Sequence, residues 1–189
     1  DPIRPEVSQA VDELRQAGIR VAMVTGDIGP TAAYVAGQVG LDGDQRVAGS
    51  ELEGRSEEGY EAAAQGASVF ARTTPEQKLR LVQAFQRLGE VVAVTGDGVN
   101  DAPALRTAHV GVAMGERGTD VAREAADLVL TDDSFARLTD GVAIGRKAFD
   151  NFSKGITYYL SAKAILLSIF VVPLVVGSPF PLAPLQIIA

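Results

Sequence analysis

The longest apolar stretch of the chain runs from Ile156 to Val176, and it limits the possible folds more than any other feature. It contains 21 residues, and as an α-helix it would be about 31 Å long. That length matches the hydrocarbon core of a bilayer, so the sequence predicts a transmembrane helix over 156–176. The alternative is a buried helix of a soluble domain, because four polar residues interrupt the run. They are Thr157, Ser161, Lys163 and Ser168.

Basic residues flank this segment on one side only. Arg146, Lys147 and Lys154 precede it, and no Lys or Arg follows it in the sequence. Because cytoplasmic flanks of membrane helices carry the excess of positive charge, this bias predicts that residues 1–155 are cytoplasmic.

The segments on either side of the predicted span have their own signals. Apolar residues at roughly helical spacing predict a stalk helix over 134–155, which Ser134 would cap. Residues 177–189 predict a short extracytoplasmic turn followed by the start of another membrane helix. The sequence is therefore interpreted as part of an integral, multi-pass membrane protein.

Residues 1–133 have a different character, because short apolar strands alternate there with amphipathic helices. This alternation predicts an α/β domain with a parallel sheet. Expected strands cover 20–24, 68–71, 91–94, 110–113 and 128–130. Expected helices cover 5–17, 31–39, 57–65, 119–126 and a segment that starts at Pro75 and ends at Gly89. The stretch from 41 to 66 is otherwise less regular.

A compact polar motif follows the strand expected at 91–94, whose apolar residues between Gly89 and Gly96 predict a buried parallel strand. Residues 95–105 read TGDGVNDAPAL, with Asp97 at the carboxyl end of the strand and Asp101 four residues later. Open α/β sheets bind ligands at the carboxyl ends of their strands. Mg²⁺ prefers oxygen ligands and usually takes one or two carboxylates together with a substrate phosphate. The motif thus favours a magnesium and phosphate site over the alternative, a turn that merely caps a helix.

The helix at Pro75 has a well-defined start. Thr74 is suited to be its N-cap, Pro75 to be its first residue, and Gln77 to complete a capping box. Lys78 then falls in the first turn, where a positive charge opposes the helix dipole. A nearby phosphate or aspartate would compensate that charge. The alternative for Lys78 is a solvated surface residue.

Composition excludes several classes of function. The net charge of −7 and the pI near 4.7 disfavour a nucleic-acid-binding protein, so no nucleic-acid partner is expected. The sequence has no cysteine, which excludes disulfides and thiolate chemistry. It has a single histidine, His109, and one imidazole does not make a metal site.

The motif at 95–105 resembles the hinge motif of P-type ATPases, cation pumps whose phosphorylation domain has the haloacid dehalogenase-like fold. Other segments resemble that family in the same order. They are DPIRP at 1–5, VTGD at 24–27, FARTTPEQK at 70–78, GVAMG at 111–115 and GTDVA at 118–122. The resemblance implies a partial haloacid dehalogenase-like, Rossmann-type domain over 1–133, and it implies ATP and Mg²⁺ as cofactors.

The resemblance also implies roles for individual residues. Thr25 would hydrogen-bond the phosphoryl group, and Lys78 would offset its charge. Asp97 and Asp101 would hold Mg²⁺. The nucleotide and its phosphates would be bound by Thr25, Gly26, Asp27, Arg72, Lys78 and Asn100.

These pumps are phosphorylated on the Asp of an Asp-Lys-Thr-Gly motif, and no Asp-Lys pair occurs in this sequence. By resemblance, the acceptor aspartate, its strand, the nucleotide-binding domain and the actuator loop precede residue 1. The chain is therefore expected to be a fragment whose sheet lacks the nucleophile strand, between the strands that end at Thr25 and Thr95. The isolated chain is predicted to be inactive.

Lys163 departs from one branch of the family. Calcium pumps of that branch use an Asn and, three residues later, a Glu on this helix, where the present chain has Lys163 and Leu166. An intramembrane lysine suggests function, so Lys163 is a candidate built-in counter-charge on the transport path. The alternatives for the whole chain are a phosphohydrolase of the same fold and a non-catalytic nucleotide-binding module.

Overall fold

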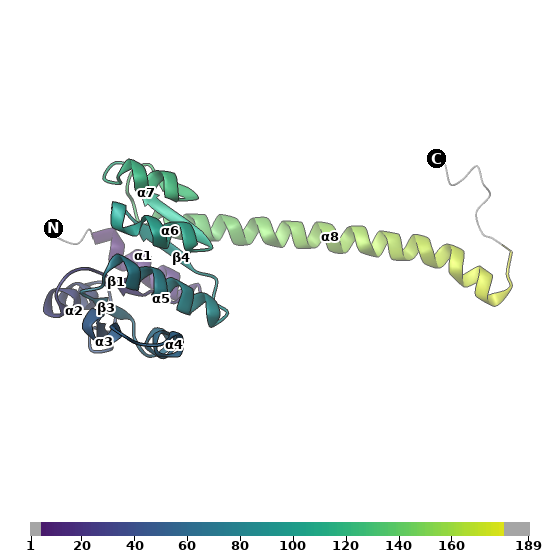
Figure 1. Cartoon of the computed structure of the whole chain (residues 1–189). Helices are drawn as coiled ribbons and strands as arrows, with labels where there is room; N and C mark the ends of the chain where they lie inside the picture. Colours follow the sequence, from purple (N-terminus) through teal and green to yellow (C-terminus); the bar gives the residue numbers. More distant parts are fainter. Residues whose placement is uncertain (1–4, 180–189) are drawn as a thin grey trace. The chain divides into compact units, whose positions relative to one another are not determined.

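The structure, a computed structural model, describes residues 5–179. The chain divides into two compact units, one that ends at Asp140 and one that begins at Gly141. The first unit holds every strand that the structure describes, and the second is occupied by most of one long helix (Figure 1). The DPIR segment at 1–4 and the expected second membrane segment at 180–189 lie outside the described residues.

The first unit contains two parallel sheets of three strands each. In the first sheet, β1 (Met23–Val24) and β2 (Arg46–Ala48) flank β3 (Val69–Ala71), with Met23 and Arg46 both paired with Val69. In the second sheet, β5 is central and its neighbours are β4 and β6. Their bounds are Ala93–Gly96 for β4, Val110–Met114 for β5 and Leu128–Leu130 for β6. The predicted α/β class with parallel strands is confirmed.

Strands β1 and β4 each form the outer edge of their sheet, and among residues 5–179 no further strand pairs with those edges. The prediction of a buried strand at 91–94 is wrong. β4 begins at Ala93, its residues are exposed or half-buried, and Val91 is 83% exposed. Strand β1 is likewise shorter than the predicted 20–24. An apolar strand becomes buried only if a neighbour covers it, and these two have a partner on one side only.

The helices largely follow the predicted ranges. Those with a predicted range are α1 (Pro5–Gln16), α2 (Gly29–Gln38), α4 (Glu57–Gly66), α5 (Pro75–Arg87) and α7 (Asp120–Ala125). Helix α6 (Ala102–Thr107) and the 3₁₀ turn η1 (Val99–Asp101) before it lie in the motif after β4, where no helix range was predicted. Within the stretch judged less regular, the structure adds strand β2 and the four-residue helix α3 (Gly49–Leu52). Both elements are too short for a periodic apolar pattern to show in the sequence.

Alternate residues of β3 connect the first sheet to two separate cores. Phe70 packs in a cluster with Tyr60 of α4 and Leu81 of α5. Val69 and Ala71 pack in another cluster, which includes residues of α1 and α2. This is the period-two alternation of a strand covered on both faces. A third, smaller cluster of Leu105, Ala113 and Ala122 supports the second sheet.

The helix α8 (Arg137–Val176) is continuous for 40 residues. It begins three residues after Ser134, which therefore is not its cap as predicted. Ser134 instead donates its backbone N–H to Asp132, and Arg137 pairs with the same carboxylate at 3.2 Å. The hydrogen bond from the Ser134 N–H is the main cause that holds the pKa of Asp132 below its usual range, and the hydrogen bond from Arg137 is the second.

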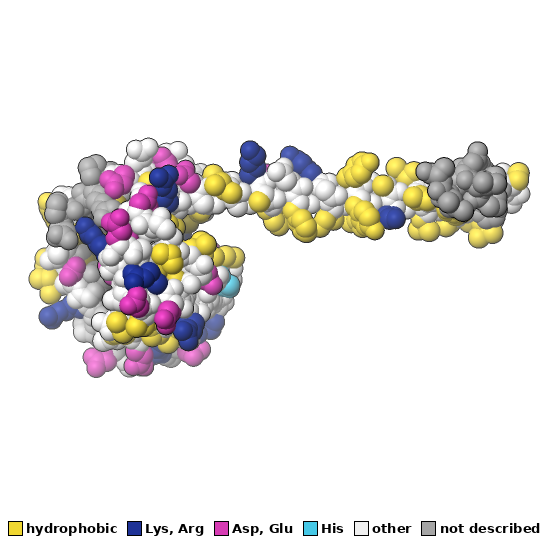
Figure 2. Space-filling model, turned by 90° about the horizontal axis from the view of Figure 1, so that it is seen from above, with side chains coloured by type: hydrophobic (Ala, Val, Ile, Leu, Met, Phe, Trp, Pro, Cys, Tyr) yellow, Lys and Arg dark blue, Asp and Glu magenta, His cyan; other side chains and the backbone are white. Residues whose placement is uncertain are grey.

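By length and composition, α8 could cross a membrane, and none of its apolar window is buried. Figure 2 shows hydrophobic side chains along the helix, interspersed with a few basic ones. Pro173 lies inside the helix near its end. The helix has no break at 156, so the predicted stalk and span belong to one rod.

The N-terminus of α5 is capped as the sequence predicts. Thr74 Oγ1 accepts from the Gln77 N–H at 3.2 Å, and Gln77 Oε1 accepts from the Thr74 N–H at 3.0 Å. Gln77 also donates from Nε2 to the carbonyl oxygen of Gly49 at 2.8 Å. The capping box thereby joins α5 to the start of α3.

Replacing Thr74 by Ala removes one half of this capping box. We expect Thr74→Ala to lower the free energy of unfolding by about 1 kcal/mol, as measured by denaturant unfolding of the detergent-solubilised protein. Thr74→Ser keeps the acceptor oxygen and should behave like the unsubstituted protein. Equal losses for the Ser and Ala variants would contradict the capping role.

Candidate functional site

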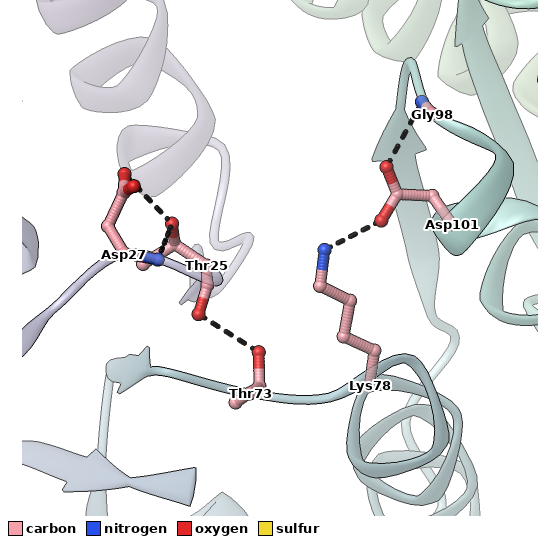
Figure 3. A network of polar contacts seen from close by, with 6 residues as sticks. All are labelled: Thr25, Asp27, Thr73, Lys78, Gly98 and Asp101. Carbon is pink, nitrogen blue, oxygen red and sulfur yellow. Dashed lines mark hydrogen bonds and ion pairs between the residues drawn. The ribbon is translucent and has the colours of Figure 1, made fainter.

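The candidate site lies where three loops follow the parallel strands. Thr25 comes directly after β1, Arg72 and Thr73 follow β3, and Asp97 comes directly after β4. Figure 3 shows how Lys78 of α5 extends to Asp101 of η1, while Thr25 faces Asp27 and Thr73. Of the sequence-predicted residues, the structure joins Thr25, Asp27 and Arg72 in one hydrogen-bonded group and Lys78 and Asp101 in another.

The first group fixes the loop after β1. The Thr25 hydroxyl donates to Asp27 Oδ2 at 3.2 Å and accepts from the Asp27 N–H at 3.1 Å. The carbonyl oxygen of Thr25 accepts from both the hydroxyl and the N–H of Thr73, each at 3.0 Å. The Arg72 N–H donates to the carbonyl oxygen of Asp27 at 2.8 Å. Five hydrogen bonds therefore hold this turn in place.

Sequence reasoning missed Thr73, although the residue is buried and fastens the Thr25 loop. It occupies a variable position of the FARTTPEQK segment, so no motif identified it. Its neighbour Arg72 has a φ of 53°, a left-handed backbone conformation that is uncommon for residues other than glycine. Such strain is found preferentially at functional loops.

The second group centres on an ion pair. Lys78 Nζ lies 2.7 Å from Asp101 Oδ1, and the two side chains are 20% and 16% exposed. Asp101 Oδ2 also accepts from the Gly98 N–H at 3.3 Å. Asp101 thereby supplies the negative charge that Lys78 needs in the first turn of α5.

Glycine is required at position 96 for this arrangement. A Cβ there would lie 2.6 Å from Cβ of Asp101, which is too close for two non-bonded carbon atoms. The close approach of the Gly96 backbone to Asp101 fixes the turn between β4 and η1.

Asp97 and Asn100 have exposed side chains at the same turn. The Asp97 carbonyl oxygen accepts from the N–H of Thr119 at 2.8 Å, a contact that the sequence did not suggest. Within residues 5–179, no group of three or more His, Cys, Asp or Glu side chains is placed to hold a metal ion. Two carboxylates, one of them already paired with Lys78, fit an ion that also depends on water and phosphate oxygens, as Mg²⁺ does.

The predicted nucleotide-contacting residues Gly26 and Arg72 lie away from the Lys78 and Asp101 pair, at the edge of a cavity. Both line a cavity of about 650 Å³ formed by the loops after β1 and β3 together with α3, α4 and α5. Lys78, Asp97, Asn100 and Asp101 are not among its lining residues. The structure therefore separates a cavity beside Arg72 from the Lys78 and Asp101 pair.

Lys163 belongs to the second unit. Its Nζ lies 5.4 Å from the centroid of the Tyr159 ring, one helical turn earlier on α8, within the range of a cation–π interaction.

Comparison with known proteins agrees with the fold and with the resemblance in the sequence. Residues 1–109 match the family model described as haloacid dehalogenase-like hydrolase. The whole chain is 47% identical to a calcium-transporting ATPase 1 of Yarrowia lipolytica and covers 21% of it. The whole chain is also 50% identical to a probable cation-transporting ATPase F of Mycobacterium bovis and again covers 21% of it.

Solved structures give the same picture. A zinc-transporting PIB-type ATPase in the E2.Pi state superposes with a TM-score of 0.72 at 31% sequence identity. The match covers 94% of the present chain and 24% of that protein. The chain thus spans about a fifth of the length of the curated relatives it matches.

The Lys78 and Asp101 pair should contribute measurably to stability because both side chains are largely shielded. In a double-mutant cycle of Lys78→Met and Asp101→Ala, we expect a coupling energy of about 1–2 kcal/mol in denaturant unfolding. The exposed pair of Arg137 and Asp140, 3.5 Å apart, is the control and should show no measurable coupling. Additive effects at Lys78 and Asp101 would mean that the pair does not stabilise the fold.

Proposed function

Because the chain belongs to the haloacid dehalogenase-like hydrolase family and is homologous over its whole length to cation-transporting P-type ATPases, we propose that it forms part of an ATP-driven cation pump. The full-length protein hydrolyses ATP through an aspartyl-phosphate and moves a cation across a membrane. The observation that carries this proposal is the presence, in one chain, of the Lys78 and Asp101 site and of a helix long and apolar enough to span a bilayer.

Within this proposal, the chain's own residues bind and orient the phosphoryl group. Thr25 turns its hydroxyl from Asp27 toward a phosphoryl oxygen. Lys78 keeps one N–H on Asp101 and directs the others at the phosphoryl oxygens, since an ammonium has three donors. Phosphoryl transfer is catalysed mainly by such positioning and charge neutralisation.

Asp97 and Asp101 are the residues that would hold Mg²⁺, which when bound offsets negative charge on the phosphoryl oxygens. Asn100, on the same turn, contacts a phosphate oxygen. Gly26, Asp27 and Arg72 face the nucleotide, with Gly26 and Arg72 on the wall of the cavity described above. The acceptor carboxylate comes from a part of the full-length protein outside these 189 residues.

The membrane part of the proposal rests on α8. Residues 156–176 cross the bilayer, and residues 1–155 lie on its cytoplasmic side because Arg146, Lys147 and Lys154 precede the apolar run. The full-length protein is a multi-pass membrane protein. Its partners are ATP, the transported cation, the lipid bilayer and the remaining domains of the pump.

The phosphoenzyme is the direct test of the mechanism. With radiolabelled ATP and Mg²⁺, the full-length protein should form an acid-stable, hydroxylamine-sensitive phosphoprotein. Asp97→Asn should lower its amount by about 100-fold, because a preorganised charge at the phosphoryl group is lost. Asp44→Asn, at an exposed loop carboxylate that is not part of the site, is the matched control and should have no effect.

Absence of any phosphoprotein from the unsubstituted full-length protein would refute the pump mechanism. Hydrolysis of a soluble phosphomonoester without such an intermediate would favour the alternative, a phosphohydrolase. Nucleotide binding without either activity would favour a non-catalytic module. The isolated 189-residue chain should form no phosphoprotein.

Lys163 is proposed as a built-in counter-charge on the transport path. Lys163→Ala should change the number of cations moved per ATP, or the dependence of ATP hydrolysis on the cation, in the reconstituted full-length protein. Lys163→Arg retains the positive charge and should preserve both. If the Ala variant transports and hydrolyses normally, Lys163 merely extends toward the membrane surface.

A further inference from the structure

Asp133 is a buried carboxylate outside the proposed catalytic site. It lies between β6 and α8, is 6% exposed, and has a left-handed φ of 52°. Among residues 5–179, only Asp133 and Thr73 are buried polar or charged residues. A buried carboxylate is costly unless hydrogen bonds compensate it, so its partners indicate what it does.

Its partners include two consecutive backbone groups. Asp133 Oδ1 accepts from the Glu116 N–H and Oδ2 accepts from the Arg117 N–H, each at 3.0 Å. The carboxylate is thus hydrogen-bonded to the loop of residues 115–118, which links β5 to α7. In this geometry each N–H meets its own oxygen, and a carboxylate has two such oxygens whereas an amide has one.

The loop of residues 115–118 is closely constrained by further contacts. Arg123 Nη1 donates to the carbonyl oxygens of both Gly115 and Gly118, at the two ends of the loop. Any Cβ at Gly118 would overlap the carbonyl oxygen of Met114. The Gly115 N–H is bonded to the Leu130 carbonyl oxygen at 2.8 Å. A loop with so many contacts is expected to keep its internal shape when it is displaced.

The far end of the loop reaches the catalytic turn. Thr119, the residue after Gly118, donates its N–H to the carbonyl oxygen of Asp97 at 2.8 Å. One short stretch of backbone therefore contacts the proposed magnesium ligand Asp97 at one end and Asp133 in its middle.

The residues that follow Asp133 in the sequence lead into α8. Phe135 packs against the cluster formed by α1, α2 and β3. Arg137, the first residue of α8, pairs with Asp132 and Asp140. The segment 132–137 is consequently attached to both halves of the α/β unit and continues directly into the long helix.

We propose that Asp133 is a positioning residue that couples the conformation of the Asp97 turn, through Thr119 and the 115–118 loop, to the start of α8. This inference rests on the proposed function, since it names the connection by which events at the phosphoryl site reach the membrane helix. The physical basis is a path of hydrogen bonds at Thr119 and Asp133 joined by the backbone of residues 116–119, and the coupling energy along this path is what must be measured.

The decisive variant is Asp133→Asn in the full-length protein. It keeps the size of the side chain but leaves one of the two N–H groups facing an amide N–H₂ instead of an oxygen. The matched control is Asp132→Asn, which removes the neighbouring, exposed carboxylate. It leaves intact the two hydrogen bonds between Asp133 and the loop. In reconstituted vesicles we expect Asp133→Asn to form phosphoprotein within about twofold of normal, while cations moved per ATP fall by at least about fivefold.

Amide hydrogen exchange supplies a readout that does not depend on activity. Asp133→Asn should speed exchange at Glu116, at Arg117 and also at Thr119, by about tenfold or more. Asp132→Asn should leave all three amides unchanged. A merely structural role would move Glu116 and Arg117 but not Thr119.

The outcomes separate the two hypotheses. Unchanged exchange at Thr119 overturns the coupling role, whatever the activity. Parallel loss of phosphoprotein and transport, or no loss of either, overturns it as well. A failure of the unsubstituted protein to form phosphoprotein refutes the pump mechanism instead, and faster exchange at Thr119 in the variant would still support the connection from Asp133 to Asp97.

Discussion

The ion pair between Lys78 and Asp101 joins parts of the molecule that no backbone hydrogen-bond ladder joins. Lys78 belongs to the helix that follows the first sheet, and Asp101 belongs to the turn that follows the second. Among the described residues, β1 and β4 are both unpaired at their outer edges, so no strand pairing connects the two sheets. Side-chain contacts therefore help to fix the position of one sheet relative to the other. Gln86, which donates to the Thr107 carbonyl oxygen at 2.7 Å, adds a second such contact.

The same pair gives the site its electrostatic character. A lysine paired with one carboxylate is close to neutral as a unit, and it becomes a phosphate-binding group only when an anion competes for its remaining donors. A divalent ion at Asp97 and Asp101 would withdraw Asp101 from Lys78 in part and favour that exchange of partners. Under the proposed function, the ion pair would be the resting arrangement of groups that neutralise the charge of a phosphoryl group and bind its metal ion.

Sequence reasoning succeeded where the determinants were local. The start of α5 is specified by Thr74, Pro75 and Gln77, all within one helical turn, and the structure has the predicted capping box. Burial of β4 was predicted wrongly because the apolar character of Val91 does not reveal whether a neighbouring strand covers it. Contacts made by Thr73 and Thr119 join segments distant in sequence, so only the three-dimensional structure could show them.

The continuity of α8 has a mechanical consequence. At about 1.5 Å per residue, its 40 residues extend for about 60 Å. If the apolar part from 156 onward spans a bilayer, as proposed, roughly half of the helix, from Arg137 to Gly155, would be left outside it. The described helix has its single proline, Pro173, near its far end, and prolines are a principal cause of sharp kinks. Under the proposed function, a displacement applied at Arg137 would be passed along the continuous helix toward its apolar segment. Residues 132–137 are the described segment that joins the loop bonded to Asp97 with the start of α8.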